Sequence, residues 1–131
     1  EHLNRIKHAD LFLDTRPYNA HTTSSDALRM GLPVLTCIGK SFPSRVAASI
    51  LNSLSLTELI TETEEEYESL AIELATNPIK LKSIKDKLIH NLSSAPLFDT
   101  PLFARNLESA FKTMYEKHQN GIKPEHIYVN Y

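Results

Sequence analysis

The sequence contains a single cysteine, Cys37, and no long run of apolar residues. One cysteine cannot form an intrachain disulfide or a zinc site built from cysteines, and such cysteine usage is typical of a reducing compartment. No apolar segment approaches the length of a membrane-spanning helix, about 20 residues, and the first residues lack the basic and apolar regions of a signal peptide. We therefore expect a cytoplasmic protein with no membrane partner.

The sequence also lacks an excess of positive charge. It has 14 lysine and arginine residues against 16 aspartate and glutamate residues, which gives a formal net charge of −2. Because proteins that bind nucleic acid independently of sequence are normally basic, we expect no nucleic-acid partner. The chain is 131 residues long and 41% hydrophobic, which is enough for one modest core. It begins directly in a segment with a helical pattern, so we expect it to be a piece of a longer protein.

The first half of the chain alternates short apolar runs with helical segments. Residues 1–8 are expected to form the end of a helix, followed by a strand over residues 11–13. A helix that begins at Thr22 or Thr23 leads to a second buried strand over residues 34–36. Two strands joined by a helix favour a right-handed parallel crossover. The predicted fold class is therefore α/β, with parallel strands and flanking helices.

The helix after the first strand has recognisable signals at both ends. Thr23 and Asp26 have the spacing of a capping box, with aspartate in place of the usual glutamate, and Gly31 suits the position just after the helix. The N-terminus of such a helix presents unpaired backbone N–H groups and the positive end of the dipole, which favours a phosphate. Asp26, one turn further along, is placed to accept hydrogen bonds from a sugar hydroxyl. The pattern predicts a nucleotide or phosphate site at the carboxyl end of a parallel strand.

Simpler interpretations of these residues remain open. Thr22 and Thr23 have the side chains of ordinary N-caps, and Asp26 would then only complete the capping box and complement the dipole. His21, at the turn from strand to helix, must point either toward the crevice at the edge of the sheet or toward solvent. Cys37 is expected to be a small buried residue at a strand end rather than a nucleophile.

The second half of the chain has helical signals throughout. A helix is expected over residues 44–54, whereas the apolar run at 59–60 is too short to classify. A capping box that begins at Thr63 predicts the start of the next helix, and Asn77 followed by Pro78 predicts the start of another. The residues of these last two helices predicted to face inward are Tyr67, Leu70, Ala71, Leu74, Leu81, Ile84 and Leu88.

The C-terminal part is expected to hold one more helix. A loop rich in serine and proline at 91–101 precedes it, and the helix itself is predicted over residues 102–118. Residues 121–131 have weak periodicity and are predicted to be a docked tail. We expect an α/β part over residues 1–60 and a helical closing part over residues 61–120. The residues that the last helix is predicted to bury are Phe103, Leu107, Ala110, Phe111 and Met114.

Five segments of the chain together resemble a known family. They are ADLFLDT at 9–15, YNAHTT at 18–23, GLPVLT at 31–36, SRVAAS at 44–49 and SAPLFD at 94–99. In this order and spacing they resemble the C-terminal catalytic region of O-linked N-acetylglucosamine transferases and their SPINDLY-like relatives. The resemblance implies the C-terminal portion of the nucleotide-binding, Rossmann-like lobe of a GT-B glycosyltransferase, followed by an all-helical closing segment.

The resemblance also implies roles for individual residues of the turn. His21, Thr22 and Thr23 match the turn whose backbone amides and threonine hydroxyls contact the two phosphates of UDP. Asp26 matches the acidic residue that holds the ribose hydroxyls. A helix terminus that neutralises a phosphate in this way acts without a metal ion.

Two residues near the start of the chain resemble further members of the same site. His2 is similar to the histidine that stacks on the uracil ring, and Arg5 is similar to the basic residue one turn after it. The family uses no metal ion, so we expect neither a metal site nor another cofactor. No residue of this chain is identified as the general base.

The resemblance implies that the full-length protein transfers N-acetylglucosamine from UDP-N-acetylglucosamine to Ser or Thr of proteins, with inversion. Its partners would be that donor, protein acceptors, and an upstream catalytic lobe and tetratricopeptide repeats of the same chain. Two alternatives remain open: a SPINDLY-like protein O-fucosyltransferase that uses GDP-fucose, and a non-catalytic nucleotide-binding or scaffold module. The 131 residues alone are expected to be inactive, because half of the nucleotide site and the whole acceptor site would lie elsewhere.

Overall fold

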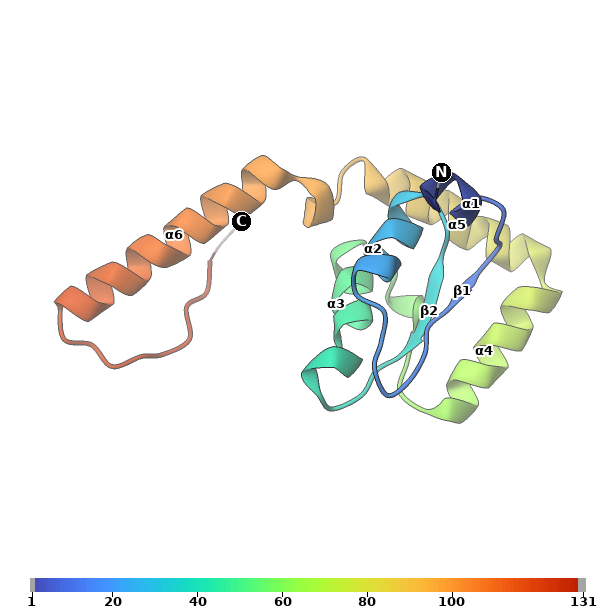
Figure 1. Cartoon of the computed structure of the whole chain (residues 1–131), viewed down its shortest axis with the longest axis horizontal. Coiled ribbons are helices and arrows are strands. Elements are labelled where there is room, and N and C mark those ends of the chain that lie inside the picture. Colours follow the sequence, from blue (N-terminus) through green and yellow to red (C-terminus); the bar gives the residue numbers. More distant parts are fainter. Residues whose placement is uncertain (1, 130–131) are drawn as a thin grey trace. The chain divides into compact units, whose positions relative to one another are not determined.

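A computed structural model gives the fold of the chain and describes residues 2–129, with only the backbone of His2 included. The chain divides into two compact units, Glu1–Leu97 and Phe98–Tyr131, which we call unit 1 and unit 2 (Figure 1). Within the described residues, no helix is both long and apolar enough to cross a membrane.

Unit 1 is built on a small parallel sheet. Its strands are β1 (Phe12–Leu13), β2 (Val34–Cys37) and β3 (Ile60–Thr61), in that order across the sheet. The run at 59–60 that the sequence left unclassified thus contributes to the third strand. The predicted α/β class and the parallel pairing of the first two strands are confirmed. The paired residues are Phe12 with Val34, Leu13 with Leu35, Thr36 with Ile60, and Cys37 with Thr61.

Helices cover both faces of this sheet. Helix α2 (Thr22–Arg29) connects β1 to β2, and the short 3-10 turn η1 (Phe42–Ser44) and helix α3 (Val46–Ser53) lead from β2 toward β3. In Figure 1, α2 and α3 lie on one side of β2, and α4 (Glu64–Thr76) lies on the other. All residues of β2 are buried, as expected for a central parallel strand that is covered on both faces. Cys37, its last residue, is accordingly buried as predicted.

The core of unit 1 consists mainly of leucines. They come from α2, α3 and α4, from the 3-10 turn η2 (Thr57–Leu59) and from α5 (Pro78–Leu92). Leu74 and Leu88 are fully buried, which confirms the inward faces predicted for α4 and α5. Burial of each such side chain stabilises the fold by about 1.5–3 kcal/mol. Helix α1 (His2–Ile6), which the sequence also predicted, packs its Ile6 against the edge of this core.

Local capping signals place the ends of several helices. At the start of α4, the Glu66 amide donates to Thr63 Oγ1 at 3.1 Å and the Thr63 amide donates to Glu66 Oε2 at 3.3 Å, which confirms the predicted capping box. At the start of α5, the Lys80 amide donates to Asn77 Oδ1 at 3.0 Å. Pro78 occupies the first position of α5, where its missing N–H has no cost.

The C-terminus of α2 also follows its sequence signal. Gly31 has a positive φ of 81°, which a residue with a side chain adopts only with strain. Its amide donates to Leu28 O at 3.0 Å, and the Leu32 amide donates to Ala27 O at 2.9 Å. These two bonds form a Schellman motif, so the chain turns directly from α2 toward β2.

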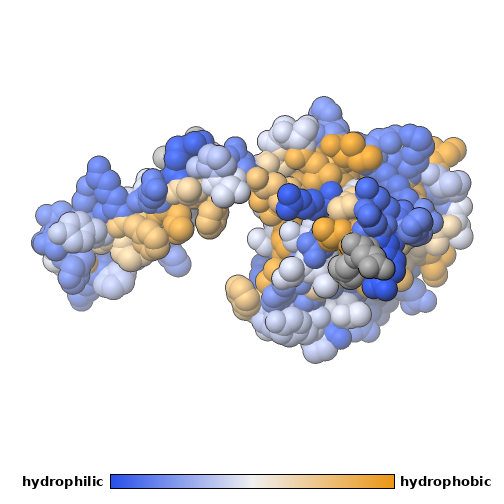
Figure 2. Space-filling model, turned by 45° about the horizontal axis from the view of Figure 1, so that its top comes forward, coloured by the Kyte–Doolittle hydropathy of each residue, from blue (hydrophilic) through white to orange (hydrophobic). Residues whose placement is uncertain are grey.

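Unit 2 contains the long helix α6 (Thr100–Gln119), and the described residues after it, 120–129, form neither helix nor strand. Asp99 caps the helix by accepting a bond from the Leu102 amide at 2.9 Å, so α6 begins inside the loop that the sequence predicted. Unit 2 does not by itself bury the apolar stripe predicted for α6: Phe103 is 65% exposed and Phe111 is 57% exposed. Spacing identified the stripe correctly, but unit 2 holds too little chain to cover it. Figure 2 shows apolar side chains together on the surface of this unit.

Candidate functional site

The N-terminus of α2 is formed differently from the sequence prediction. His21 is the N-cap residue, its side chain makes no capping hydrogen bond, and its carbonyl accepts the Ser25 amide at 3.1 Å. Thr22 and Thr23 are therefore the first two residues of the helix, and neither is an N-cap. The capping box predicted for Thr23 and Asp26 is wrong, because the chain enters the helix two residues earlier and places Asp26 in the second turn.

This helix terminus has the features of an anion site. The first amides of any α-helix lack an acceptor within the helix, and in α2 no capping side chain replaces it. Thr22 and Thr23 are exposed, so their hydroxyls lie beside these amides at the surface. The terminus follows β1, at the carboxyl edge of the parallel sheet, where open α/β sheets bind their ligands. Its chemistry therefore favours a phosphate or a carboxylate.

The ring of His21 is held by three neighbours. It stacks on Tyr18 at a centroid distance of 4.9 Å and meets the edge of Phe42 at 6.2 Å. Its Nε2 lies 3.3 Å from the carbonyl oxygen of Pro43. Because a carbonyl oxygen only accepts, Nε2 must carry a proton, and in the neutral ring Nδ1 is then left as an acceptor. The ring is thus fixed at the mouth of the helix terminus rather than pointing freely into solvent.

Asp26 lies on the same face of α2 as Thr22. The two residues are four apart in one helix, so their side chains occupy neighbouring positions on its surface. Asp26 is only partly buried, which leaves its carboxylate available to a ligand. A phosphate at the helix terminus and a sugar hydroxyl one turn further along would both be within the reach of this face.

Asp14 is a residue of the site that the sequence analysis missed. It is 4% exposed, and its Oδ1 accepts the amides of Thr15 at 2.9 Å and Ala20 at 2.7 Å. Its Oδ2 accepts the Thr36 hydroxyl at 2.7 Å, so the carboxylate also anchors the loop to β2. The sequence signal was an aspartate at the end of a predicted strand, inside the ADLFLDT segment, but a single aspartate there does not disclose three partners.

A second set of contacts holds the same loop. The Asn19 amide donates to Pro43 O at 3.1 Å, and Asn19 Nδ2 donates to Thr15 O at 2.9 Å. The hydroxyl of Tyr67 on α4 donates to the backbone carbonyl of Asp14 at 2.8 Å. Burial, with a smaller contribution from the nearby Asp14 carboxylate, raises the pKa of Tyr67 above its ordinary value of 10.0. The loop that leads into α2 is therefore bonded to η1 through Pro43 and to α4 through Tyr67.

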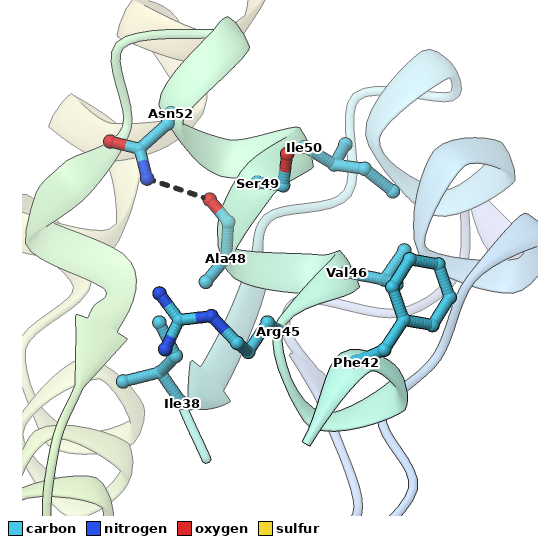
Figure 3. Close-up of a pocket in the computed structure, with 8 residues that line it drawn as sticks. All are labelled: Ile38, Phe42, Arg45, Val46, Ala48, Ser49, Ile50 and Asn52. Carbon is cyan, nitrogen blue, oxygen red and sulfur yellow. Dashed lines mark hydrogen bonds between the residues drawn. The ribbon is translucent and has the colours of Figure 1, made fainter. Parts of the chain in front are cut away.

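A pocket of 580 Å³ adjoins this terminus on the side of α3 (Figure 3). Phe42, Val46 and Ile50 are among the residues that line it, and Arg45 extends across it toward Ile38. The guanidinium of Arg45 donates to Gly39 O at 3.1 Å, which keeps the loop after β2 folded back. Because Phe42 lines the pocket and also contacts His21, the pocket and the helix terminus share a wall.

Of the two residues predicted from the start of the chain, only Arg5 has a described side chain. Arg5 is exposed on α1, which precedes β1 and lies by the C-terminal end of α2 in Figure 1, opposite the end that carries Thr22 and Thr23. The side chain of His2 lies outside the described residues, so its predicted place against a base stays a prediction. Among the side chains that the structure describes, residues 3–129, no group of three or more metal-ligating side chains comes together.

Comparisons with a family model and with individual proteins both point to glycosyl transferases. The model of glycosyl transferase family 41 matches residues 1–107. The chain is 37% identical over 130 residues to a probable UDP-N-acetylglucosamine–peptide N-acetylglucosaminyltransferase, SEC, of Arabidopsis thaliana, and 35% identical over 130 residues to the UDP-N-acetylglucosamine–peptide N-acetylglucosaminyltransferase of Caenorhabditis elegans. These matches cover 98% and 99% of this chain but only 13% and 11% of the relatives. The chain thus spans a small part of the proteins it resembles.

One solved structure resembles both the fold and the sequence. It is a Thermobaculum terrenum O-GlcNAc transferase carrying the substitution K341M, with a TM-score of 0.81 and 35% sequence identity. The match covers 86% of this chain and 22% of that structure. At this identity the predicted architecture, the C-terminal portion of a GT-B nucleotide-binding lobe, is confirmed.

Proposed function

Because this chain belongs to glycosyl transferase family 41, we propose that it is the donor-binding part of an enzyme that transfers N-acetylglucosamine from UDP-N-acetylglucosamine to Ser or Thr of proteins. The relatives described above are named for that donor and for peptide acceptors, which supports the proposal. The acceptor site and the rest of the donor site would belong to parts of the full-length protein outside these residues.

The observation that carries the proposal is the uncapped N-terminus of α2 at the carboxyl edge of the sheet. Its free amides, with the hydroxyls of Thr22 and Thr23, would bind the two phosphates of UDP. Asp26, on the same face, would accept hydrogen bonds from the ribose hydroxyls. Nδ1 of His21 would lie beside the donor as an acceptor, since Nε2 is occupied by Pro43.

Such a site would act on the leaving group. Negative charge develops on UDP as the bond to the sugar breaks, and backbone amides that are already oriented stabilise that charge without reorganising. The helix dipole contributes in the same direction. His2 and Arg5 would contact the uracil end of the donor in this proposal, once the chain preceding α1 completes the site.

Titration calorimetry of the full-length protein tests this function directly. The proposal predicts measurable binding of UDP and of UDP-N-acetylglucosamine, and no binding of GDP-fucose at the same concentrations. Preferential binding of GDP-fucose would instead identify a protein O-fucosyltransferase, although the names of the relatives do not favour it. Absence of binding with all three nucleotides would leave a non-catalytic scaffold module and overturn the proposal.

The isolated 131 residues provide a second test. We expect them to transfer no sugar to protein, because the chain corresponds to 22% of the similar solved transferase. Glycosylation of a protein acceptor by the isolated chain, measured with labelled UDP-N-acetylglucosamine, would contradict this expectation.

A further inference from the structure

We infer that Asp14 is a positioning residue of the donor site: its buried carboxylate holds the loop before α2 in the shape that presents the uncapped helix terminus. The inference rests on the proposed function, because the terminus is taken to bind the diphosphate. Asp14 itself would touch no ligand, since it is 4% exposed and its carboxylate oxygens bind groups of the protein.

The geometry gives each carboxylate oxygen of Asp14 a separate task. Oδ1 accepts amides from both ends of the loop, Thr15 at 2.9 Å and Ala20 at 2.7 Å, and so closes it. Ala20 immediately precedes His21, so this closure sets the point at which the chain enters α2. Oδ2 accepts the Thr36 hydroxyl at 2.7 Å and fixes the closed loop to the central strand.

A carboxylate suits this role better than any other side chain of its size. It offers only acceptors, and three N–H or O–H groups converge on it. An asparagine would keep one acceptor but would place an NH₂ group where the other oxygen stood. Hydrogen bonds to an ionised acceptor are also stronger than neutral ones, so the loop is held more rigidly.

The loop carries contacts that depend on its shape. Tyr18 and Asn19 lie within it, and they hold the His21 ring and bind Pro43 O, respectively. If the loop opens, these two contacts and the orientation of the first α2 amides are lost together. Preorganised donors lose much of their effect when they are displaced by about 1 Å, which can cost about 100-fold in rate.

The test compares three variants that remove contacts of the Asp14 carboxylate with a core variant in the full-length protein. Asp14→Ala removes both acceptors, Asp14→Asn keeps one of them, and Thr36→Val removes only the anchor to β2. Leu74→Ala is the matched control, because it opens a cavity at a fully buried position of the core and removes no hydrogen bond to the loop. UDP is titrated into each protein, and the melting temperature is measured with and without UDP.

We expect Asp14→Ala to raise the Kd for UDP about 10-fold or more, with Asp14→Asn and Thr36→Val between it and the wild type. Leu74→Ala should lower the melting temperature while its Kd stays within about twofold of the wild type. If Asp14 only stabilised the fold, Asp14→Ala and Leu74→Ala would change the Kd for UDP in proportion to the stability that each variant loses.

The outcomes distinguish this inference from the proposed function. A wild-type protein that does not bind UDP overturns the proposed function and the inference with it. A wild-type protein that binds UDP, with a folded Asp14→Ala variant of the same affinity, overturns the inference alone. If Asp14→Ala does not fold, the other two variants decide the test. Wild-type affinity for UDP in both Asp14→Asn and Thr36→Val then overturns the inference alone.

Discussion

The N-termini of α2 and α4 follow parallel strands of the same sheet, yet they are completed in opposite ways. At α4, Thr63 and Glu66 exchange hydrogen bonds with each other's backbone amides, so the helix satisfies its own first turn. At α2, the N-cap His21 makes no such bond, and its ring is turned to Tyr18, Phe42 and Pro43 instead.

The difference separates stability from function. A capping box stabilises a helix by roughly 1 kcal/mol and leaves little for a ligand to bind. An uncapped terminus gives up that stabilisation, and its amides stay available to an anion. Of these two helices, α4 supports the sheet and has the complete cap, whereas α2 lacks it where we propose that the donor binds. Helix α3 also lacks a side-chain cap, so the missing cap acquires its meaning at α2 from the exposed Thr22 and Thr23 beside it.

The largest effect is expected from Thr23→Pro in the full-length protein. Proline removes the amide at the second position of α2 but is compatible with a first helical turn, as Pro101 shows at the second position of α6. We expect UDP binding to weaken by about 3 kcal/mol, the upper end for a hydrogen bond to a charged group. Calorimetric titration with UDP measures the change.

Glu65→Pro is the matched control, since Glu65 is the second residue of α4. It should leave the UDP affinity unchanged. Equal losses of affinity in both variants would mean that proline acts by disturbing the fold rather than by removing a ligand contact.

Asp26→Ala should weaken UDP binding by about 1–3 kcal/mol, because a carboxylate that accepts sugar hydroxyls would be lost. The matched control is Asp86→Ala on α5, which removes an exposed aspartate paired only with Lys82. UDP and free phosphate are compared in the same titrations. A similar loss for phosphate as for UDP would contradict contact between Asp26 and the ribose.

Thr63→Ala, at the N-terminus of α4, should reduce stability and leave UDP binding unchanged. Loss of the cap is expected to lower the stability of the full-length protein by about 1 kcal/mol, seen as a lower midpoint of urea unfolding. UDP affinity should stay at the wild-type value. A change in affinity would show that the two helix termini are coupled.

Tyr67→Phe should give an effect of similar size at neutral pH, about 0.5–1.5 kcal/mol of stability, because it removes one hydrogen bond from α4 to the loop before α2. The pH dependence of stability tests the role of Tyr67 more specifically than the size of this effect does. The pKa of Tyr67 is raised in the folded state, so the folded protein holds this proton more tightly than the unfolded chain. This contribution is complete below about pH 10 and is lost as the pH rises above it.

Unfolding of the wild type and Tyr67→Phe is compared at pH 8 and at alkaline pH. The wild type should lose stability toward high pH more steeply than the variant. Equal slopes for the two proteins would mean that Tyr67 does not titrate differently in the folded state.

Much of the fold could be predicted because its signals are local. Gly31 ends α2, Thr63 begins α4 and Asn77 begins α5, and each acts through residues within a few positions of itself. The same local logic failed at Thr23, where the capping-box spacing is present but the chain has already entered the helix. The stripe on α6 was recognised by its spacing, but spacing does not say whether a partner surface is present to cover it.

The sequence by itself determined the order of the first two strands and of the helices, the parallel pairing of those strands, and the position of Thr22 and Asp26 on one face of α2. The tertiary structure alone decided that His21 is the N-cap and that Asp14 holds the loop before it. Asp14 and Thr36 are 22 residues apart, as are His21 and Pro43. Such contacts form only after the sheet brings the loop before α2 next to β2 and the segment that follows it. Local sequence patterns cannot predict them, because the partners are distant in the chain.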